Sequence, residues 1–129
     1  MIRIVIFLLA LSACQADESI SGFVEPEADW KLISIAGENF NANGTISFPE
    51  KGRVIGRAPC NQFQAEQSAP YPWFELGPIM STKRACPDLA AENSMLQSLA
   101  KMTISEASGD ALILSNDAGL EILFQRTRP

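Results

Sequence analysis

Residues 87–102 read PDLAAENSMLQSLAKM and decide the fold of this 129-residue chain. The apolar residues in this stretch recur at helical spacing and form one stripe: Leu89, Met95, Leu96, Leu99 and Met102. Pro87 suits a first helical turn because its missing N–H costs nothing there, and Asp88 and Glu92 lie near the positive end of the helix dipole. We therefore predict a single helix of about 15 residues, with Lys101 near its negative end.

Short stretches with strand character, separated by turn sequences, surround this helix on both sides. Before it come WKLISIA (30–36), TISF (45–48), RVIGRA (53–58), CNQFQAEQ (60–67) and WFELGPIM (73–80), and after it come residues 103–107, 111–115 and 120–126. Many short strands with one helix predict an α+β fold. We expect a curved antiparallel sheet or open barrel packed on a single helix, in one domain that spans residues 30–126.

The N-terminus has the features of an export signal. Arg3 precedes an apolar run over residues 4–13, and ten helical residues span only about 15 Å, half the hydrocarbon thickness of a bilayer. The run ends in Leu-Ser-Ala-Cys at positions 11–14, which resembles the lipobox of bacterial lipoproteins. The resemblance implies that residues 1–13 are a signal peptide and that Cys14 is lipidated. In lipoprotein sorting, Asp directly after the lipidated cysteine favours retention in the inner membrane. Gln15 occupies this position, so we expect the protein at the outer membrane, facing the periplasm.

Residues 14–29 are acidic, contain Gly22 and Pro26, and show no clear periodicity, so we expect a flexible tether between lipid and domain. The whole chain has a net charge of -5. Removal of residues 1–13 takes away Arg3 and no acid, which gives -5 - 1 = -6. An acidic surface argues against nucleic acid as a partner and gives no attraction to anionic lipid. Membrane contact is therefore expected through the lipid on Cys14.

Once Cys14 carries lipid, two cysteines remain. Export places Cys60 and Cys86 in an oxidising compartment, where an even number of cysteines suggests a disulfide. The chain-entropy model gives roughly 3.5 kcal/mol for closing such a loop. Two free buried thiols and a metal site are the alternatives, although a chain with no histidine offers zinc too few ligands.

Two cysteine motifs carry a resemblance to a known family. The stretch GRAPCNQF (56–63) is similar to Gly-x-x-x-Cys-Asn-x-[Phe/Tyr], and TKRACP (82–87) is similar to Thr-x-x-Ala-Cys-Pro. On these motifs residues 30–126 resemble the META domain of HslJ-like bacterial lipoproteins; QAE at 64–66 departs from the small residue and glycine common there. The resemblance implies antiparallel strands around one helix and a Cys60–Cys86 bridge. It implies no particular enzymatic activity, but an association with stress and the cell envelope.

Nothing in the sequence points to an enzyme, a cofactor or a small-molecule substrate. Without histidine the chain lacks the commonest general base and cannot form a Ser-His pair. Glu66 with Glu75 is a conceivable carboxylate pair, although both positions suit solvent.

Asn61 and Thr82 lie beside the motif cysteines. They form either a small polar site or contacts to local backbone groups, and we expect the second. The basic residues Arg53, Arg57, Lys83 and Arg84 form either a basic spot or solvated positions.

The stretch 69–74 (APYPWF) combines aromatic side chains with two prolines. Tyr71, Trp73 and Phe74 are therefore candidates for binding a partner, because Tyr and Trp dominate interface hot spots. If the stretch is a strand, only one of Trp73 and Phe74 can point inward. We expect a non-catalytic, lipid-anchored envelope protein that supports stress tolerance by binding or scaffolding an envelope partner. The alternative is a tethered periplasmic inhibitor of a lysozyme or protease, which would need this stretch to protrude.

Overall fold

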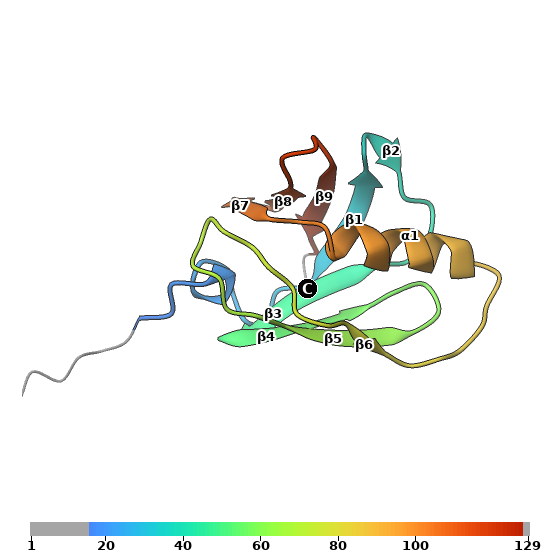
Figure 1. Cartoon of the computed structure of the whole chain (residues 1–129), viewed down its shortest axis with the longest axis horizontal. Helices are drawn as coiled ribbons and strands as arrows, with labels where there is room; N and C mark the ends of the chain where they lie inside the picture. The colour runs from blue at the N-terminus through green and yellow to red at the C-terminus, as the bar shows by residue number, and fades with distance from the viewer. Residues whose placement is uncertain (1–15, 128–129) are drawn as a thin grey trace, which may run out of the picture.

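The computed structural model of the chain describes residues 16–127, which form nine strands, one α-helix and one 3-10 turn (Figure 1). The elements are η1 (Ile20–Gly22), β1 (Trp30–Ile35), β2 (Glu38–Asn39), β3 (Thr45–Glu50), β4 (Gly52–Arg57), β5 (Gln62–Gln67), β6 (Met80–Ser81), α1 (Leu89–Leu99), β7 (Ile104–Ser108), β8 (Ala111–Ser115) and β9 (Glu121–Arg126). The predicted signal peptide and Cys14 lie outside the described residues.

The strands form one antiparallel sheet in the order β6-β5-β4-β3-β1-β9-β8-β7, with β2 paired to β1. The sheet curves but does not close into a barrel, because the end strands β6 and β7 are not neighbours in it (Figure 1). The predicted α+β class, with a curved antiparallel sheet and a single helix, is confirmed. The apolar face of the sheet and the apolar stripe of the helix are thereby buried against each other.

Helix α1 supplies the centre of the core. Met95 and Leu99 are fully buried and pack with sheet residues that include Phe48 and Phe124. Burying each such side chain contributes about 1.5–3 kcal/mol. The helix is shorter than the predicted 15 residues, since it has 11 and begins two positions after Pro87. The turn before it is closed by the Leu89 N–H, which donates to the Cys86 carbonyl at 3.2 Å.

The strand prediction holds at 111–115 and is wrong at 73–80. Of WFELGPIM only Met80 belongs to a regular strand. Pro78 has no N–H for a ladder, and the N–H groups of Phe74 and Glu75 are taken by Thr103 O and Gln67 Oε1. The segment therefore crosses the molecule as irregular chain.

The prediction of a flexible tether is wrong for residues 17–29. Ile20 is only 1% exposed and belongs to the core, and Ala28 is also buried. Ser19 forms a bridge to Pro70, and the Tyr71 N–H donates to the Glu18 carbonyl at 2.7 Å. The ordered domain therefore begins close to residue 17. Within residues 16–127 no helix has both the length and the apolar character needed to cross a bilayer.

Candidate functional site

The loop before β5 and the loop before α1 are joined by a disulfide between Cys60 and Cys86. The Cα atoms of the two residues are 5.6 Å apart. The bridge that parity and the resemblance both indicated is therefore present. It connects positions 26 apart in sequence and fixes the start of α1 beside the end of the β4–β5 loop.

Asn61 makes the same connection through hydrogen bonds. Its side-chain Oδ1 accepts from the Arg84 N–H at 2.6 Å and from Thr82 Oγ1 at 2.9 Å, while Nδ2 donates to the Arg84 carbonyl at 2.9 Å. Thr82 Oγ1 in turn accepts from the Gln62 N–H at 3.2 Å. Asn61 and Thr82 thus satisfy backbone groups of neighbouring loops, as expected; Asn61 is buried, whereas Thr82 is exposed.

Glu92 is a buried carboxylate that the sequence analysis missed. It is 3% exposed, and its Oε1 accepts from the N–H groups of Asn61 at 2.7 Å and Cys60 at 3.1 Å. Its Oε2 accepts from Asn61 Nδ2 at 2.7 Å. The sequence analysis placed Glu92 near the positive end of the helix dipole and did not predict its burial. The available signal was its spacing of three, four and seven from Met95, Leu96 and Leu99, which puts Glu92 on the apolar stripe.

We call Asn61, Thr82, Glu92 and the Cys60–Cys86 bridge the bridge cluster. Both oxygens of Glu92 are already occupied by N–H donors, and so are the amide groups of Asn61. Buried polar groups that are satisfied in this way stabilise one arrangement of the chain. The bridge cluster is therefore suited to holding loops in place and has no group left to act on a ligand.

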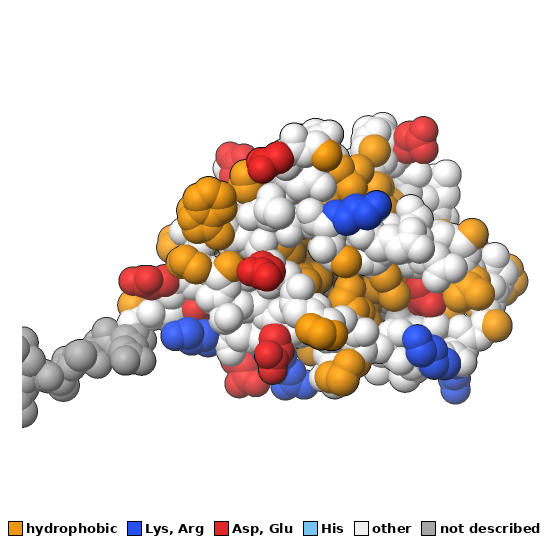
Figure 2. Space-filling model, viewed as in Figure 1, with side chains coloured by type: hydrophobic (Ala, Val, Ile, Leu, Met, Phe, Trp, Pro, Cys, Tyr) orange, Lys and Arg blue, Asp and Glu red, His pale blue; other side chains and the backbone are white. Residues whose placement is uncertain are grey.

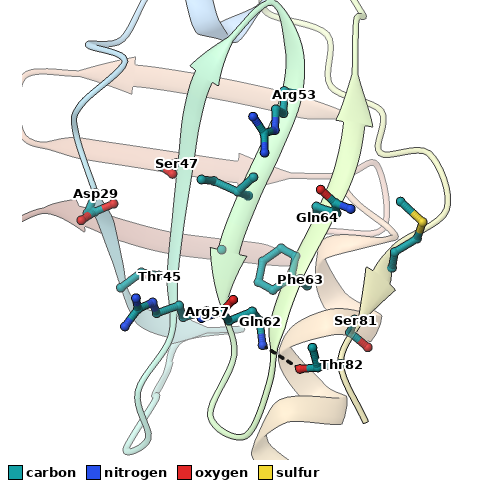
Figure 3. A pocket seen from close by; sticks show the side chains of 13 residues that line it. Asp29, Thr45, Ser47, Arg53, Arg57, Gln62, Phe63, Gln64, Ser81 and Thr82 are labelled. Carbon is teal, nitrogen blue, oxygen red and sulfur yellow. Dashed lines mark hydrogen bonds between the residues drawn. The ribbon is translucent and has the colours of Figure 1, made fainter.

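A groove lies on the face of β3, β4, β5 and β6 that points away from the core (Figure 3). Its volume is about 920 Å³, and the residues that line it are Asp29, Thr45, Ser47, Arg53, Ile55, Gly56, Arg57, Gln62, Phe63, Gln64, Met80, Ser81 and Thr82. The strand registers set these side chains in rows across the sheet. Arg57 lies between Thr45 and Gln62, and Ile55 lies between Ser47 and Gln64.

The groove has a mixed lining, in which the donors of two arginines, amides and hydroxyls lie with the Asp29 carboxylate and the apolar Ile55 and Met80. Arg53 and Arg57 are exposed, and Figure 3 shows both side chains on β4 among the amides and hydroxyls. Arg53 approaches Glu50 at 3.6 Å, but both side chains are more than half exposed, so the pair contributes little. Within residues 16–127 Arg57 has no ion pair. Lys83 and Arg84 do not line the groove, so the basic spot is limited to two arginines.

Gly56 is one of the lining residues, but a side chain there would point toward the core, where its neighbours across the sheet, Ile46 and Phe63, are buried. A Cβ atom at this position would lie 2.4 Å from the ring of Phe63 on the neighbouring strand and 2.4 Å from the Thr45 carbonyl oxygen. Only glycine permits such a close approach of ring and backbone. The first glycine of the 56–63 motif therefore lets Phe63 pack flat across β4.

The candidate aromatic residues of 69–74 have different environments. Phe74 is 2% exposed and belongs to the core, so its assignment as a partner-binding residue is corrected. Trp73 is 59% exposed, which agrees with the expected alternation. Tyr71 is half-buried, and its hydroxyl accepts from the Ala107 N–H at 3.0 Å. Of the three, only Trp73 is largely free to contact another molecule.

Segment 69–74 is held by hydrogen bonds to Gln67 and to β7 and does not protrude. The buried Gln67 amide accepts from the N–H groups of Ala69 and Glu75, both at 3.0 Å. The Pro72 carbonyl accepts from the Ser105 N–H at 2.7 Å, so the segment covers the outer edge of β7. Covering an edge strand blocks pairing with other chains. Glu75, like Glu66, is exposed, as expected for a solvated residue.

Comparison with known proteins gives a family and a fold. The model of the META domain matches residues 24–129. No curated protein sequence matches significantly. A crystal structure of a DUF4847-family protein from Bacteroides vulgatus aligns with a TM-score of 0.68 at 9% identity, covering 83% of this chain and 97% of that one. An NMR structure of a protein from Burkholderia xenovorans aligns with a TM-score of 0.63 at 18% identity, covering 79% and 83%. The structural neighbours support the fold, and on the match over residues 24–129 this chain belongs to the META domain family.

Proposed function

We propose that the protein is a lipoprotein of the cell envelope whose META domain binds an envelope partner without catalysing a reaction. In this proposal residues 1–13 are removed, Cys14 carries acyl chains, and the domain faces the periplasm from the outer membrane. The supporting observation for the anchor is the lipobox at positions 11–14. Binding a partner in this way would serve tolerance of envelope stress.

The groove over β3 to β6 is the observation that supports binding. It combines two arginines with the amides of Gln62 and Gln64. Guanidinium and amide groups donate hydrogen bonds in fixed geometry to carboxylates and carbonyl oxygens. A protein partner that exposes acidic side chains or free backbone carbonyls would match this surface.

The inhibitor alternative depends on a rigid loop that enters an active site. The candidate segment 69–74 lies against β7 and the N-terminal segment, with Phe74 in the core. A loop in this position offers Trp73 but no extended stretch of backbone to a protease or lysozyme. The geometry therefore favours the binding module.

The test is cross-linking of the mature lipoprotein in its own envelope, followed by recovery with Arg57→Glu and Lys101→Glu as matched charge reversals. Both residues are exposed, but Lys101 lies after α1 and outside the groove. Arg57→Glu should lower recovery of the partner about tenfold or more, the range for an interface anchor, while Lys101→Glu should not. Equal recovery with both variants would contradict the groove. Turnover of an envelope substrate, abolished by one carboxylate substitution, would contradict the non-catalytic role.

A further inference from the structure

Two of the most exposed large apolar side chains lie on segments that meet where the described chain begins. Phe23 is 56% exposed and Trp73 is 59% exposed. Tyr71 connects them, because its ring stacks on Phe23 with centroids 4.3 Å apart and it is two residues from Trp73. We call Phe23, Tyr71 and Trp73 the aromatic cluster. Figure 2 shows apolar side chains on the end of the molecule from which the grey chain leaves.

The segments that carry the aromatic cluster are ordered. The Phe23 N–H donates to the Ile20 carbonyl at 2.9 Å, and Ile20 is anchored in the core. The Asp17 carboxylate accepts hydrogen bonds from the hydroxyls of Ser19 and Ser21. The rings therefore lose little conformational entropy when they contact another surface.

The chain length between the lipobox and this end of the domain is short. Three peptide units separate Cys14 from Asp17, and they span at most about 11 Å. The headgroup layer on each side of a bilayer is roughly 5–7 Å thick. A lipid on Cys14 would therefore hold the aromatic cluster next to the membrane surface, whereas a free tether of 15 residues would have allowed about 50 Å.

We propose that the aromatic cluster inserts into the headgroup layer of the membrane in which Cys14 is anchored, and so orients the domain. This inference rests on the proposed lipid anchor. Trp and Tyr rings favour the interface between headgroups and acyl chains, because they are apolar with a polar edge. Since the anchor already holds the domain at the surface, a few rings suffice where an unanchored domain would not stay bound.

The charges around the aromatic cluster indicate whether it contacts anionic or zwitterionic headgroups. Asp17, Glu18, Glu25 and Glu27 lie on the same N-terminal segment and outnumber the two cations that act on it, Lys51 near Asp17 and Arg126 paired with Glu25. Anionic headgroups repel such a surface, so the contact is with zwitterionic lipid. Adding anionic phosphatidylglycerol to phosphatidylcholine vesicles should weaken insertion or leave it unchanged, and stronger insertion would contradict the assignment.

The experiment uses the full lipidated protein in phosphatidylcholine vesicles, with and without bromine on the acyl chains near the glycerol. Bromine quenches tryptophan emission at short range. The chain has two tryptophans, and Trp30 is buried in the core, so quenching reports on Trp73. We expect brominated lipid to reduce the emission of the wild type and to leave that of Trp73→Phe, which retains only Trp30, unchanged.

Two variants make the test specific. Phe23→Ser should reduce the quenching of Trp73, whereas Leu89→Ser should not, because it changes a 38% exposed side chain at the start of α1, at the other end of the molecule in Figure 1. Circular dichroism checks that each variant is folded. If the protein floats with vesicles but Trp73 is not quenched, the membrane contact is overturned and the anchor stands. If the protein does not float, the anchor is overturned and the contact with it.

Discussion

The backbone N–H of Asn61 donates to Oε1 of Glu92 at 2.7 Å, which joins the start of β5 to the first turn of α1. The disulfide makes the same connection covalently, from Cys60, next to Asn61, to Cys86, six residues before Glu92. Helix and sheet are thus linked twice at one place, once through sulfur and once through a buried carboxylate. Both links come from residues within or near the two motifs of the family.

Replacing Glu92 should destabilise the domain strongly. Glu92→Ala leaves the N–H groups of Cys60 and Asn61 and the Asn61 amide without their acceptor. Each unsatisfied buried donor costs about 1–3 kcal/mol, so the free energy of unfolding should fall by about 3 kcal/mol or more. Urea unfolding measures the loss. Glu106→Gln, on an exposed position of β7, is the control and should change stability by less than about 0.5 kcal/mol. A similar small effect at both sites would refute a structural role for Glu92.

Reducing the Cys60–Cys86 bridge should lower the melting temperature by about 10 °C or more, because the open loop regains roughly 3.5 kcal/mol of chain entropy when the domain unfolds. Calorimetry of the protein with and without reductant measures this shift. The native protein should also contain no reactive thiol at these positions. Quantitative labelling of Cys60 or Cys86 without reductant is incompatible with the bridge.

Tyr71 should contribute to stability, because it is half-buried and holds segment 69–74 to β7 and to Phe23. Tyr71→Phe keeps the stack on Phe23 but leaves the Ala107 N–H without the hydroxyl, at a cost of about 1 kcal/mol. Tyr71→Ala also removes the ring and should cost more. Thermal unfolding of the two variants separates the contributions. Two variants as stable as the wild type would show that the segment is not held at β7.

The hydrogen bonds that Asp17 accepts should make the free energy of unfolding depend on pH in the acidic range. Burial raises the pKa of Asp17, but the hydrogen bonds from Ser19 and Ser21 and the charge of Lys51 outweigh it, so the pKa is lowered from 3.8. A lowered pKa contributes stability that is present above the unfolded value and is lost as pH falls through the folded value. The wild type should therefore be more stable than Asp17→Asn at neutral pH, with the difference shrinking below pH 3.8. Melting curves across this range measure the difference. A constant difference down to the most acidic pH would contradict the assignment.

Periodicity predicted the regular parts of the fold well. The stripe of α1 and the alternation over residues 111–115 identified a helix and a strand at nearly their observed places. These elements bury one face by regular spacing, so the sequence carries the signal locally. The Cys60–Cys86 pairing was also suggested by export and parity.

Other features depend on contacts between distant residues, which local pattern does not show. Ile20 is buried because Ser19 and Glu18 meet Pro70 and Tyr71, although its own segment is acidic and lacks periodicity. Residues 73–80 have strand composition, but the side chain of Gln67 and the carbonyl of Thr103 take the N–H groups that a strand would use. For Glu92 the local spacing indicates a place on the apolar stripe, but it does not show the hydrogen-bond partners, which lie 31 and 32 positions away.

Both the proposed envelope location and the proposed membrane contact depend on a lipid at Cys14. Its most direct test is mass spectrometry of the N-terminal peptide of the mature protein, purified from the membrane fraction. We expect a chain that begins at Cys14 with two or three acyl chains, since one chain gives only marginal membrane binding. A mature protein that retains residues 1–13, or one that begins at Cys14 without acyl groups, would contradict it.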